Sequence, residues 1–184
     1  IAALDEAETE TCLTTLEPLV EAIELNISSP NTAGLRRFQD PDTLRGLLER
    51  LNASRQKPLF IKIPPYQDGA SRENVMALVR VCREVGVTGI TAINTVPVED
   101  SRLAMGRGGL SGAAILQDML RIVAEVRSEV GSAMVVNACG GIGSADDARR
   151  ALDAGADTVQ LYSALVYCGP GLVREIVAGL TSQS

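Results

Sequence analysis

A short polar cluster raises the question of what chemistry this chain supports. It lies in the stretch ELNISSPNTAGL, where an apolar run ends in the residues Asn26, Ser28, Ser29, Asn31 and Thr32 around Pro30. Asparagine side chains donate and accept hydrogen bonds, and a serine hydroxyl takes up a proton only in a dry site or with a proton relay. The cluster is therefore either a simple turn or the reactive end of a strand.

A single lysine is the second candidate for chemistry. Lys62 lies inside the apolar run FIKIP. A lysine in such a run is costly unless it is paired or faces a polar site. Its most natural partner is an anion or an electron-rich ring, and the alternative is an inward-facing salt bridge to a carboxylate.

Two glycine clusters could bring the backbone close to a ligand. Gly140, Gly141 and Gly143 precede a helix that we expect to start near Ala145. Glycines allow close approach and a helix N-terminus offers free N–H groups, so this loop could hold a phosphate. The alternative is a tight turn in which Ser144 only caps the helix. The second cluster, GRGGLSG at 106–112, is a mobile loop over a ligand, another close-approach site or a flexible linker.

The rest of the sequence predicts strands and helices that alternate along the chain. Apolar runs predict strands at 21–27, 58–63, 89–94, 133–138 and 158–162. Helical periodicity, capping residues and closing glycines predict helices at 3–20, 40–51, 71–86, 111–131, 144–155 and 169–180. This alternation predicts an α/β fold with a parallel sheet, and the continuous apolar strands predict burial on both faces.

Polar groups or glycines follow every predicted strand, at the edge where parallel α/β folds bind ligands. Two architectures fit this pattern. One is a five-stranded doubly wound sheet, and the other is part of a (β/α)8 barrel, which typically needs about 250 residues. The length of 184 residues favours the first architecture, whereas the loops favour the second.

Composition and charge exclude several classes of function. The net charge of −6 gives no indication of binding to nucleic acid or to an anionic membrane surface. No apolar run approaches the roughly 20 residues that span a bilayer, and the acidic start is unlike a signal peptide. The chain begins at Ile1 rather than Met, so we expect residues to be missing upstream.

The cysteines also argue against metal binding. The chain has no histidine and no CxxC pair, which disfavours a zinc site and a histidine-based triad. Scattered thiols are typical of a reducing, cytoplasmic setting. We expect all four to be packing residues: Cys12, Cys82, Cys139 and Cys168.

The motifs LNISSPNTAGL, IKIPP, INT, GGLSG, CGGI and VQLYSAL occur in this order, from about Glu24 to Leu180. This succession resembles the dihydroorotate dehydrogenase family, which are FMN-dependent (β/α)8 barrels of pyrimidine biosynthesis that oxidise dihydroorotate to orotate. The resemblance implies that residues 1–184 hold the last five βα units of a flavin-binding TIM barrel. The three earlier units are not found, so we expect a fragment of a larger protein, or an oligomer or partner that supplies the missing strands.

The resemblance also implies a role for individual residues. Ser29 is the catalytic base for C5 of dihydroorotate, and the hydride from C6 passes to flavin N5. The residues that bind the substrate are Asn26, Asn31, Asn94 and Thr95. The residues that bind FMN are Asn26, Lys62, Ile93, Gly108, Gly109, Gly140, Gly141, Tyr162 and Ser163.

A serine at the base position resembles the quinone-reducing class of the family, which is peripheral to the membrane and carries an N-terminal helical extension. No such extension is found in this sequence. The residues just before the glycines include Asn137 and Cys139, which depart from the usual family pattern, so a related dihydropyrimidine is an alternative substrate.

Two other hypotheses about function stay open. One is a phosphate-binding barrel such as a phosphosugar isomerase, which leaves Ser29 and Asn31 unused. The other is a non-catalytic half-barrel.

Overall fold

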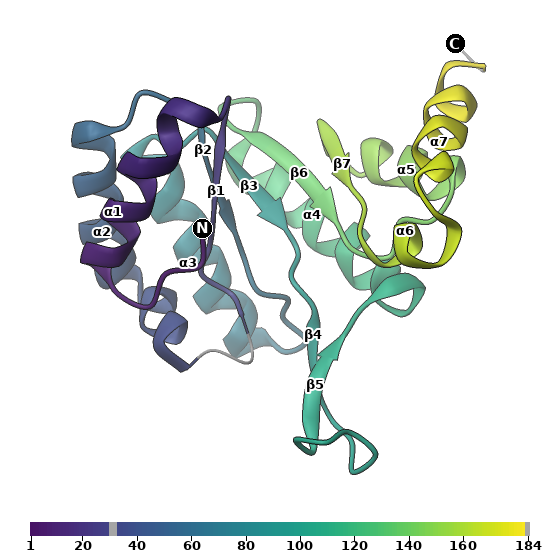
Figure 1. Cartoon of the computed structure of the whole chain (residues 1–184), viewed down its shortest axis with the longest axis horizontal. Helices are drawn as coiled ribbons and strands as arrows, with labels where there is room; N and C mark the ends of the chain where they lie inside the picture. Colours follow the sequence, from purple (N-terminus) through teal and green to yellow (C-terminus); the bar gives the residue numbers. More distant parts are fainter. Residues whose placement is uncertain (30–32, 183–184) are drawn as a thin grey trace.

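The centre of the structure is a parallel sheet whose strands follow the order of the chain. This computed structural model describes residues 1–29 and 33–182. The strands lie side by side in the order β1 (Ile23–Asn26), β2 (Leu59–Lys62), β3 (Gly89–Ala92), β6 (Val135–Cys139) and β7 (Thr158–Gln160) (Figure 1). A doubly wound sheet reverses its strand order, whereas a barrel wall does not. The sheet is therefore a section of barrel wall, which decides between the two predicted architectures.

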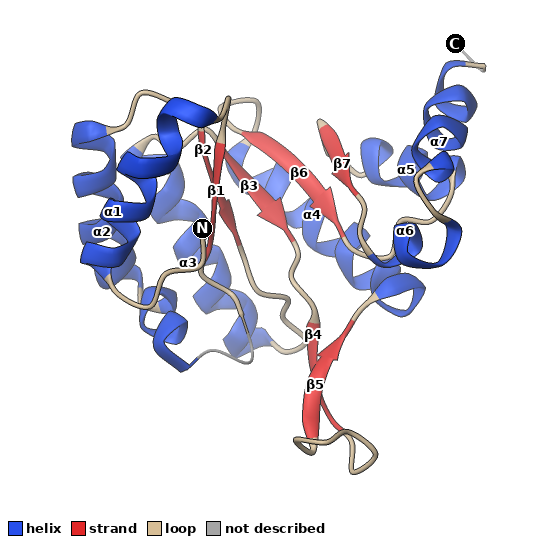
Figure 2. Cartoon of the chain, viewed as in Figure 1, coloured by secondary structure: helices blue, strands red, loops and turns tan. Residues whose placement is uncertain are grey.

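Helices connect the strands and pack against one another in sequence. The long helices are α1 (Glu6–Leu16), α2 (Pro41–Ser54), α3 (Gly69–Val85), α4 (Leu116–Val130), α5 (Ala145–Asp153) and α7 (Gly171–Thr181). From α1 to α5 each helix contacts the next, and α5 contacts α7. Figure 2 shows this layer flanking the sheet. The predicted helices at 3–20 and 111–131 are shorter than expected, because parts of both form 3₁₀ turns, at Glu17–Leu19 and Gly112–Ile115.

The central strand β3 is buried on both faces, as predicted, whereas β1 and β2 are buried on one face only. Burial alternates along β1 and β2 between buried and half-buried residues. The buried set packs against the helices and includes Leu25 and Ile61, together with Leu44 and Leu48 of α2. The half-buried set includes Asn26 and Lys62. Polar side chains on this inner face are half-buried on β1 and β2, and they are buried at Thr91 and Asn137 in the middle of the sheet.

Two elements near the C-terminal edge of the sheet are absent from the sequence-based prediction. The glycine cluster at 106–112 contains strand β5 (Arg107–Leu110), which pairs antiparallel with β4 (Val96–Glu99) in a projecting hairpin (Figure 1). Gly109 is required because a Cβ there would collide with the side chain of Thr95. The second missed element is the short helix α6 (Ser163–Cys168) after β7.

The free edge of β1 is partly occupied. The amino group of Ile1 donates to the Glu24 carbonyl at 2.7 Å, and the Asn26 amide donates to the Ile1 carbonyl at 2.8 Å. At the opposite end of the sheet, β7 has no second strand beside it among the described residues. Only one of the two sheet edges thus has backbone hydrogen-bonding partners.

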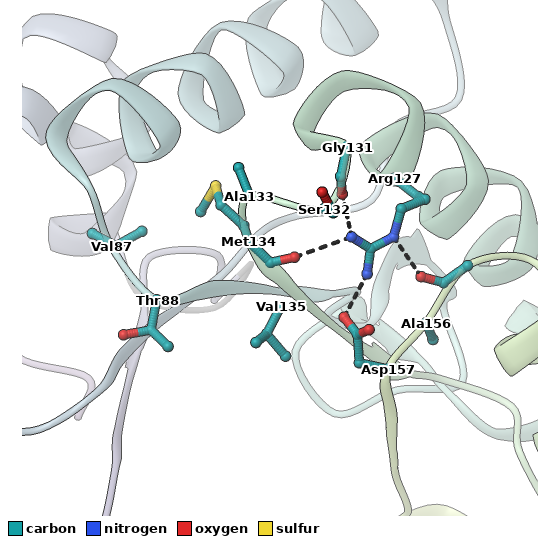
Figure 3. A pocket seen from close by; sticks show the side chains of 11 residues that line it. Val87, Thr88, Arg127, Gly131, Ser132, Ala133, Met134, Val135, Ala156 and Asp157 are labelled. Carbon is teal, nitrogen blue, oxygen red and sulfur yellow. Dashed lines mark hydrogen bonds and ion pairs between the residues drawn. The ribbon is translucent and has the colours of Figure 1, made fainter.

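An arginine joins three segments at the N-terminal edge of the sheet. The Arg127 guanidinium donates to the carbonyls of Gly155 at 2.8 Å and Met134 at 3.0 Å. It also bonds the Gly131 carbonyl and pairs with Asp157 (Figure 3). These residues line a cavity of about 680 Å³ at the edge opposite the predicted site. Because the guanidinium already has these partners, we assign it a role in stability.

Helix α3 begins at a different cap from the predicted Ser71. Asp68 is the N-cap, and its carboxylate accepts from the Ser71 amide at 2.7 Å and from the Ser71 hydroxyl at 2.8 Å. The backbone N–H and the hydroxyl of Ser71 lower the pKa of Asp68 below its usual value of 3.8. Ser71 is thus the third residue of a capping box rather than the cap itself.

We expect Asp68→Ala to lower the Tm by about 2–4 °C at pH 7, because a helix N-cap is lost. The pKa of Asp68 is lower in the folded chain, so its contribution is complete above pH 3.8 and disappears as the pH falls through the folded value. Thermal unfolding followed by circular dichroism should therefore show a smaller difference at pH 3 than at pH 7. Asp153→Ala, at an exposed carboxylate, is the control. A difference that grows toward low pH would contradict the cap assignment.

Candidate active site

The largest cavity beside the predicted site residues lies at the C-terminal edge of the sheet. Its volume is about 690 Å³, within the range of small-molecule sites. It is lined from the ends of β2, β3, β6 and β7 and from α6. The predicted site residues in this lining are Lys62, Ile93, Asn94, Thr95, Gly140, Gly141, Tyr162 and Ser163.

Lys62 contributes a cation to the wall of this cavity. Its Nζ donates to Cys139 Sγ at 3.3 Å and lies 4.0 Å from Glu24 Oε1. The Lys62 side chain is 18% exposed and that of Glu24 is 30% exposed. Lys62 therefore has the carboxylate neighbour of the second interpretation, and it also lines the large cavity.

A hydrogen-bonded amide cluster joins the end of β1 to the end of β3. Asn26 Oδ1 accepts from the Ser28 amide at 3.0 Å, from Ser28 Oγ at 2.9 Å and from Asn94 Nδ2 at 3.2 Å. Asn94 Nδ2 also donates to Ser28 Oγ at 2.9 Å, while Asn94 Oδ1 accepts from the Thr95 amide at 2.8 Å. This network fixes the orientation of both amide groups. Asn26 Nδ2 has no hydrogen-bond acceptor among the described residues, and Asn26 itself lines neither the large cavity nor the smaller one beside it.

Ser28 is the member of this cluster to which sequence analysis gave no role. It is 3% exposed and lies between Asn26 and Asn94. A serine within a polar run after a strand gives no signal that separates a structural hydroxyl from a reactive one. The contact with Asn94, far away in the sequence, exists only in the folded chain.

Ser29 lines a second, smaller cavity of about 290 Å³ beside the first. Thr95 lines both cavities and so connects the surroundings of Ser29 to those of Lys62. Ser29 itself is half-buried. Asn31, predicted to bind substrate, lies outside the described residues.

The glycine-rich turn after β6 both turns the chain and lines the large cavity. Gly140 and Gly141 have φ values of 137° and 79°, which disfavour any side chain. Ser144 caps α5 as predicted, with its Oγ accepting from the Asp147 amide at 3.1 Å. The Gly143 amide donates to Asp147 Oδ2 at 3.2 Å.

Other backbone N–H groups at this end of the cavity remain available to a ligand. The amides of Gly141, Tyr162 and Ser163 donate to no described residue. All three residues line the cavity, and Tyr162 is 79% exposed. Backbone donors grouped in this way suit an anion such as a phosphate.

The structure separates Gly108 and Gly109 from the other predicted flavin-binding residues. Both lie in β5, paired with Val98 and Pro97, and neither lines the cavity. The same glycine cluster contributes Gly112 and the neighbouring Ser111 instead. The glycine cluster does allow a close approach of the backbone, as predicted, but at Gly109 the approaching group is the side chain of Thr95 rather than a ligand.

The cysteines do not all pack in the core, which corrects the sequence-based expectation. Cys82 is fully buried, and burial raises the pKa of its thiol to about 12. Cys139 is half-buried and Cys168 is exposed, and both line the large cavity. Gln160 and Asp147 are further lining residues that sequence analysis missed.

Neither a metal site nor a membrane-spanning helix is present in the described part of the chain. No group of three or more His, Cys, Asp or Glu side chains there is placed to hold a metal ion. None of the described helices is long and apolar enough to cross a bilayer.

The fold and the site define a section of a (β/α)8 barrel with a large cavity at the C-terminal edge of its strands. The chain belongs to the dihydroorotate dehydrogenase family, because the model of that family, described as dihydroorotate dehydrogenase, matches residues 1–183. This match confirms the resemblance found in the sequence. Enzymes of this family are flavin-dependent.

Individual relatives agree with this assignment. The chain is 38% identical over 175 residues to the dihydroorotate dehydrogenase (quinone) of Leifsonia xyli, covering 91% of this chain and 50% of that protein. It is 39% identical over 172 residues to the protein of the same name from Sphingopyxis alaskensis, covering 90% of this chain and 48% of the relative. The chain thus spans about half the length of the curated relatives that it matches.

A solved structure supports the fold. Ligand-free dihydroorotate dehydrogenase from Eimeria tenella superimposes with a TM-score of 0.85 at 25% identity, covering 96% of this chain and 55% of that one. The five-stranded sheet therefore corresponds to part of a larger barrel. This confirms the predicted fold class.

Proposed function

We propose that this chain contributes the substrate and flavin site of an enzyme that oxidises dihydroorotate to orotate. The observation that carries the proposal is the large cavity at the C-terminal edge of the sheet, which gathers most of the residues assigned to substrate and flavin from four strand ends and α6. A phosphosugar isomerase would use the glycine loop but would leave the Asn26–Ser28–Asn94 cluster without a role. We propose residues 1–184 as the last five βα units of the barrel, completed by strands outside this chain or from a partner.

The residues of the large cavity fit FMN. When bound, FMN accepts the hydride that the substrate loses. Lys62 would hold the electron-rich edge of the flavin ring, where a fixed cation stabilises negative charge. The free amides of Gly141, Tyr162 and Ser163 would hold the phosphate group.

The remaining site residues act on the substrate. Ser29 takes the proton from C5, and the adjoining small cavity would let that proton leave by water. Asn26 and Asn94 hold the pyrimidine amide edges, with orientations fixed through Ser28. Asn31 is proposed as a further substrate ligand. Following the quinone named in its relatives, we propose a quinone as electron acceptor.

A visible absorption spectrum tests this proposal. The purified chain mixed with FMN and then passed through a desalting column should keep flavin absorbance near ~450 nm, and dihydroorotate should bleach it without oxygen. Lys62→Met should retain less flavin, whereas Lys57→Met, in the loop before β2 and outside the cavity, should retain the normal amount. Retained flavin that dihydroorotate leaves unbleached would point to another dihydropyrimidine. A colourless protein would contradict flavin binding by this chain and favour the non-catalytic half-barrel.

A further inference from the structure

A set of polar side chains lies behind Lys62 on the inner face of the sheet. Glu24 is two residues before Asn26 on β1 and therefore faces the same side of the strand. Thr91 is in register with Lys62, and Asn137 is in register with Thr91. Barrel interiors at such positions usually hold bulky branched apolar residues. A polar set there, which the proposed mechanism does not use, calls for a physical explanation.

The hydrogen bonds of this set converge on one oxygen of Glu24. Its Oε2 accepts from Thr91 Oγ1 at 2.6 Å and from Gln160 Nε2 at 3.0 Å. Asn137 Nδ2 in turn donates to Thr91 Oγ1 at 3.3 Å. Donors from β3 and β7 thus hold a carboxylate of β1 in place across the sheet.

The other oxygen of Glu24 faces the cation of the site. Glu24 Oε1 lies 4.0 Å from Lys62 Nζ, and Lys62 lines the large cavity while Glu24 does not. A charge at this distance, in partly buried surroundings, offsets a substantial part of the potential that Lys62 projects into the cavity. The carboxylate therefore acts on a ligand from behind the lysine.

We infer that Glu24 is a positioning residue that sets the redox potential of the bound flavin by holding Lys62 and partly neutralising it. The inference rests on the proposed flavin site. A lone cation beside the ring would stabilise the reduced, negatively charged flavin so strongly that it would pass electrons on poorly. With Glu24 in place, Lys62 stabilises that charge less, and the flavin remains a better reductant for its acceptor.

The test is Glu24→Gln in the FMN-loaded chain, because the amide oxygen can still accept from Thr91 and Gln160 while the charge is lost. We expect the flavin midpoint potential to become more positive. Sulfite adds to oxidised flavin with a gain of negative charge on the ring, so we expect its dissociation constant to fall about fivefold. Thr91→Val is the matched control. It removes a hydrogen bond to Glu24 but keeps its charge, and we expect sulfite affinity within about twofold of normal.

The results distinguish a failure of the role proposed for Glu24 from a failure of the proposed flavin site. Bound flavin with unchanged or weaker sulfite affinity in Glu24→Gln would overturn this inference and leave the flavin site standing. An equal gain in Thr91→Val would also overturn it, because the effect would then be structural rather than electrostatic. A chain that binds no flavin would overturn the proposed site and this inference with it.

Discussion

Ser29→Ala is expected to slow the reduction of bound flavin by dihydroorotate about 100-fold or more, while flavin binding stays unchanged. A base positioned for proton removal typically contributes 10²- to 10⁴-fold, roughly, to a rate. Ser29 lines the small cavity next to the large cavity proposed to hold flavin, so its loss should leave the proposed flavin contacts intact. Stopped-flow measurement of flavin bleaching without oxygen gives the rate, and the visible spectrum before mixing gives the flavin content.

Two further variants make this result specific. Ser29→Cys keeps a group that can accept a proton and should recover part of the rate. Ser132→Ala removes an exposed hydroxyl at the opposite edge of the sheet and should bleach at the normal rate. An unchanged rate in Ser29→Ala would assign the proton to another group, and loss of flavin in the same variant would assign Ser29 to cofactor binding instead.

Arg127→Ala should cost about 3 kcal/mol of unfolding free energy, because it leaves two partly buried carbonyls and the Asp157 carboxylate without their donor. The side chain of Arg127 is 24% exposed and bonds the segments that immediately precede β6 and β7. For a chain of this size, that loss lowers the Tm by roughly 10 °C. Urea unfolding followed by circular dichroism measures the change directly.

The shape of the guanidinium should matter as well as its charge. Arg127→Lys keeps the charge, but a lysine cannot bond Gly155, Met134 and Asp157 at the same time. We therefore expect its free energy of unfolding to lie between those of the unchanged chain and Arg127→Ala. Arg174→Ala, at an exposed arginine of α7 without an ion pair to any described residue, should change stability by less than about 0.5 kcal/mol. If Arg127→Ala lowers the free energy of unfolding no more than Arg174→Ala does, the stabilising role assigned to Arg127 is contradicted.

Local sequence determined the elements of this protein and the family to which it belongs. The five parallel strands lie where apolar runs predicted them, and Asp40, Ser144 and Gly86 end or begin helices as expected. Caps and apolar runs act over a few residues, so they can be read without knowledge of the fold. The same holds for the turn at Gly140 and Gly141, where positive φ angles exclude other residues.

Tertiary structure decided which face of the sheet is polar and which residues meet there. Strand order separated a barrel wall from a doubly wound sheet, because that order depends on how distant segments pair. Ser28 between Asn26 and Asn94, and Glu24 behind Lys62, depend on contacts between strands far apart in the sequence. The hairpin removed Gly108 and Gly109 from the cavity for the same reason. Side-chain chemistry can be read from sequence, but the partner of each side chain is set by the packing of the whole sheet.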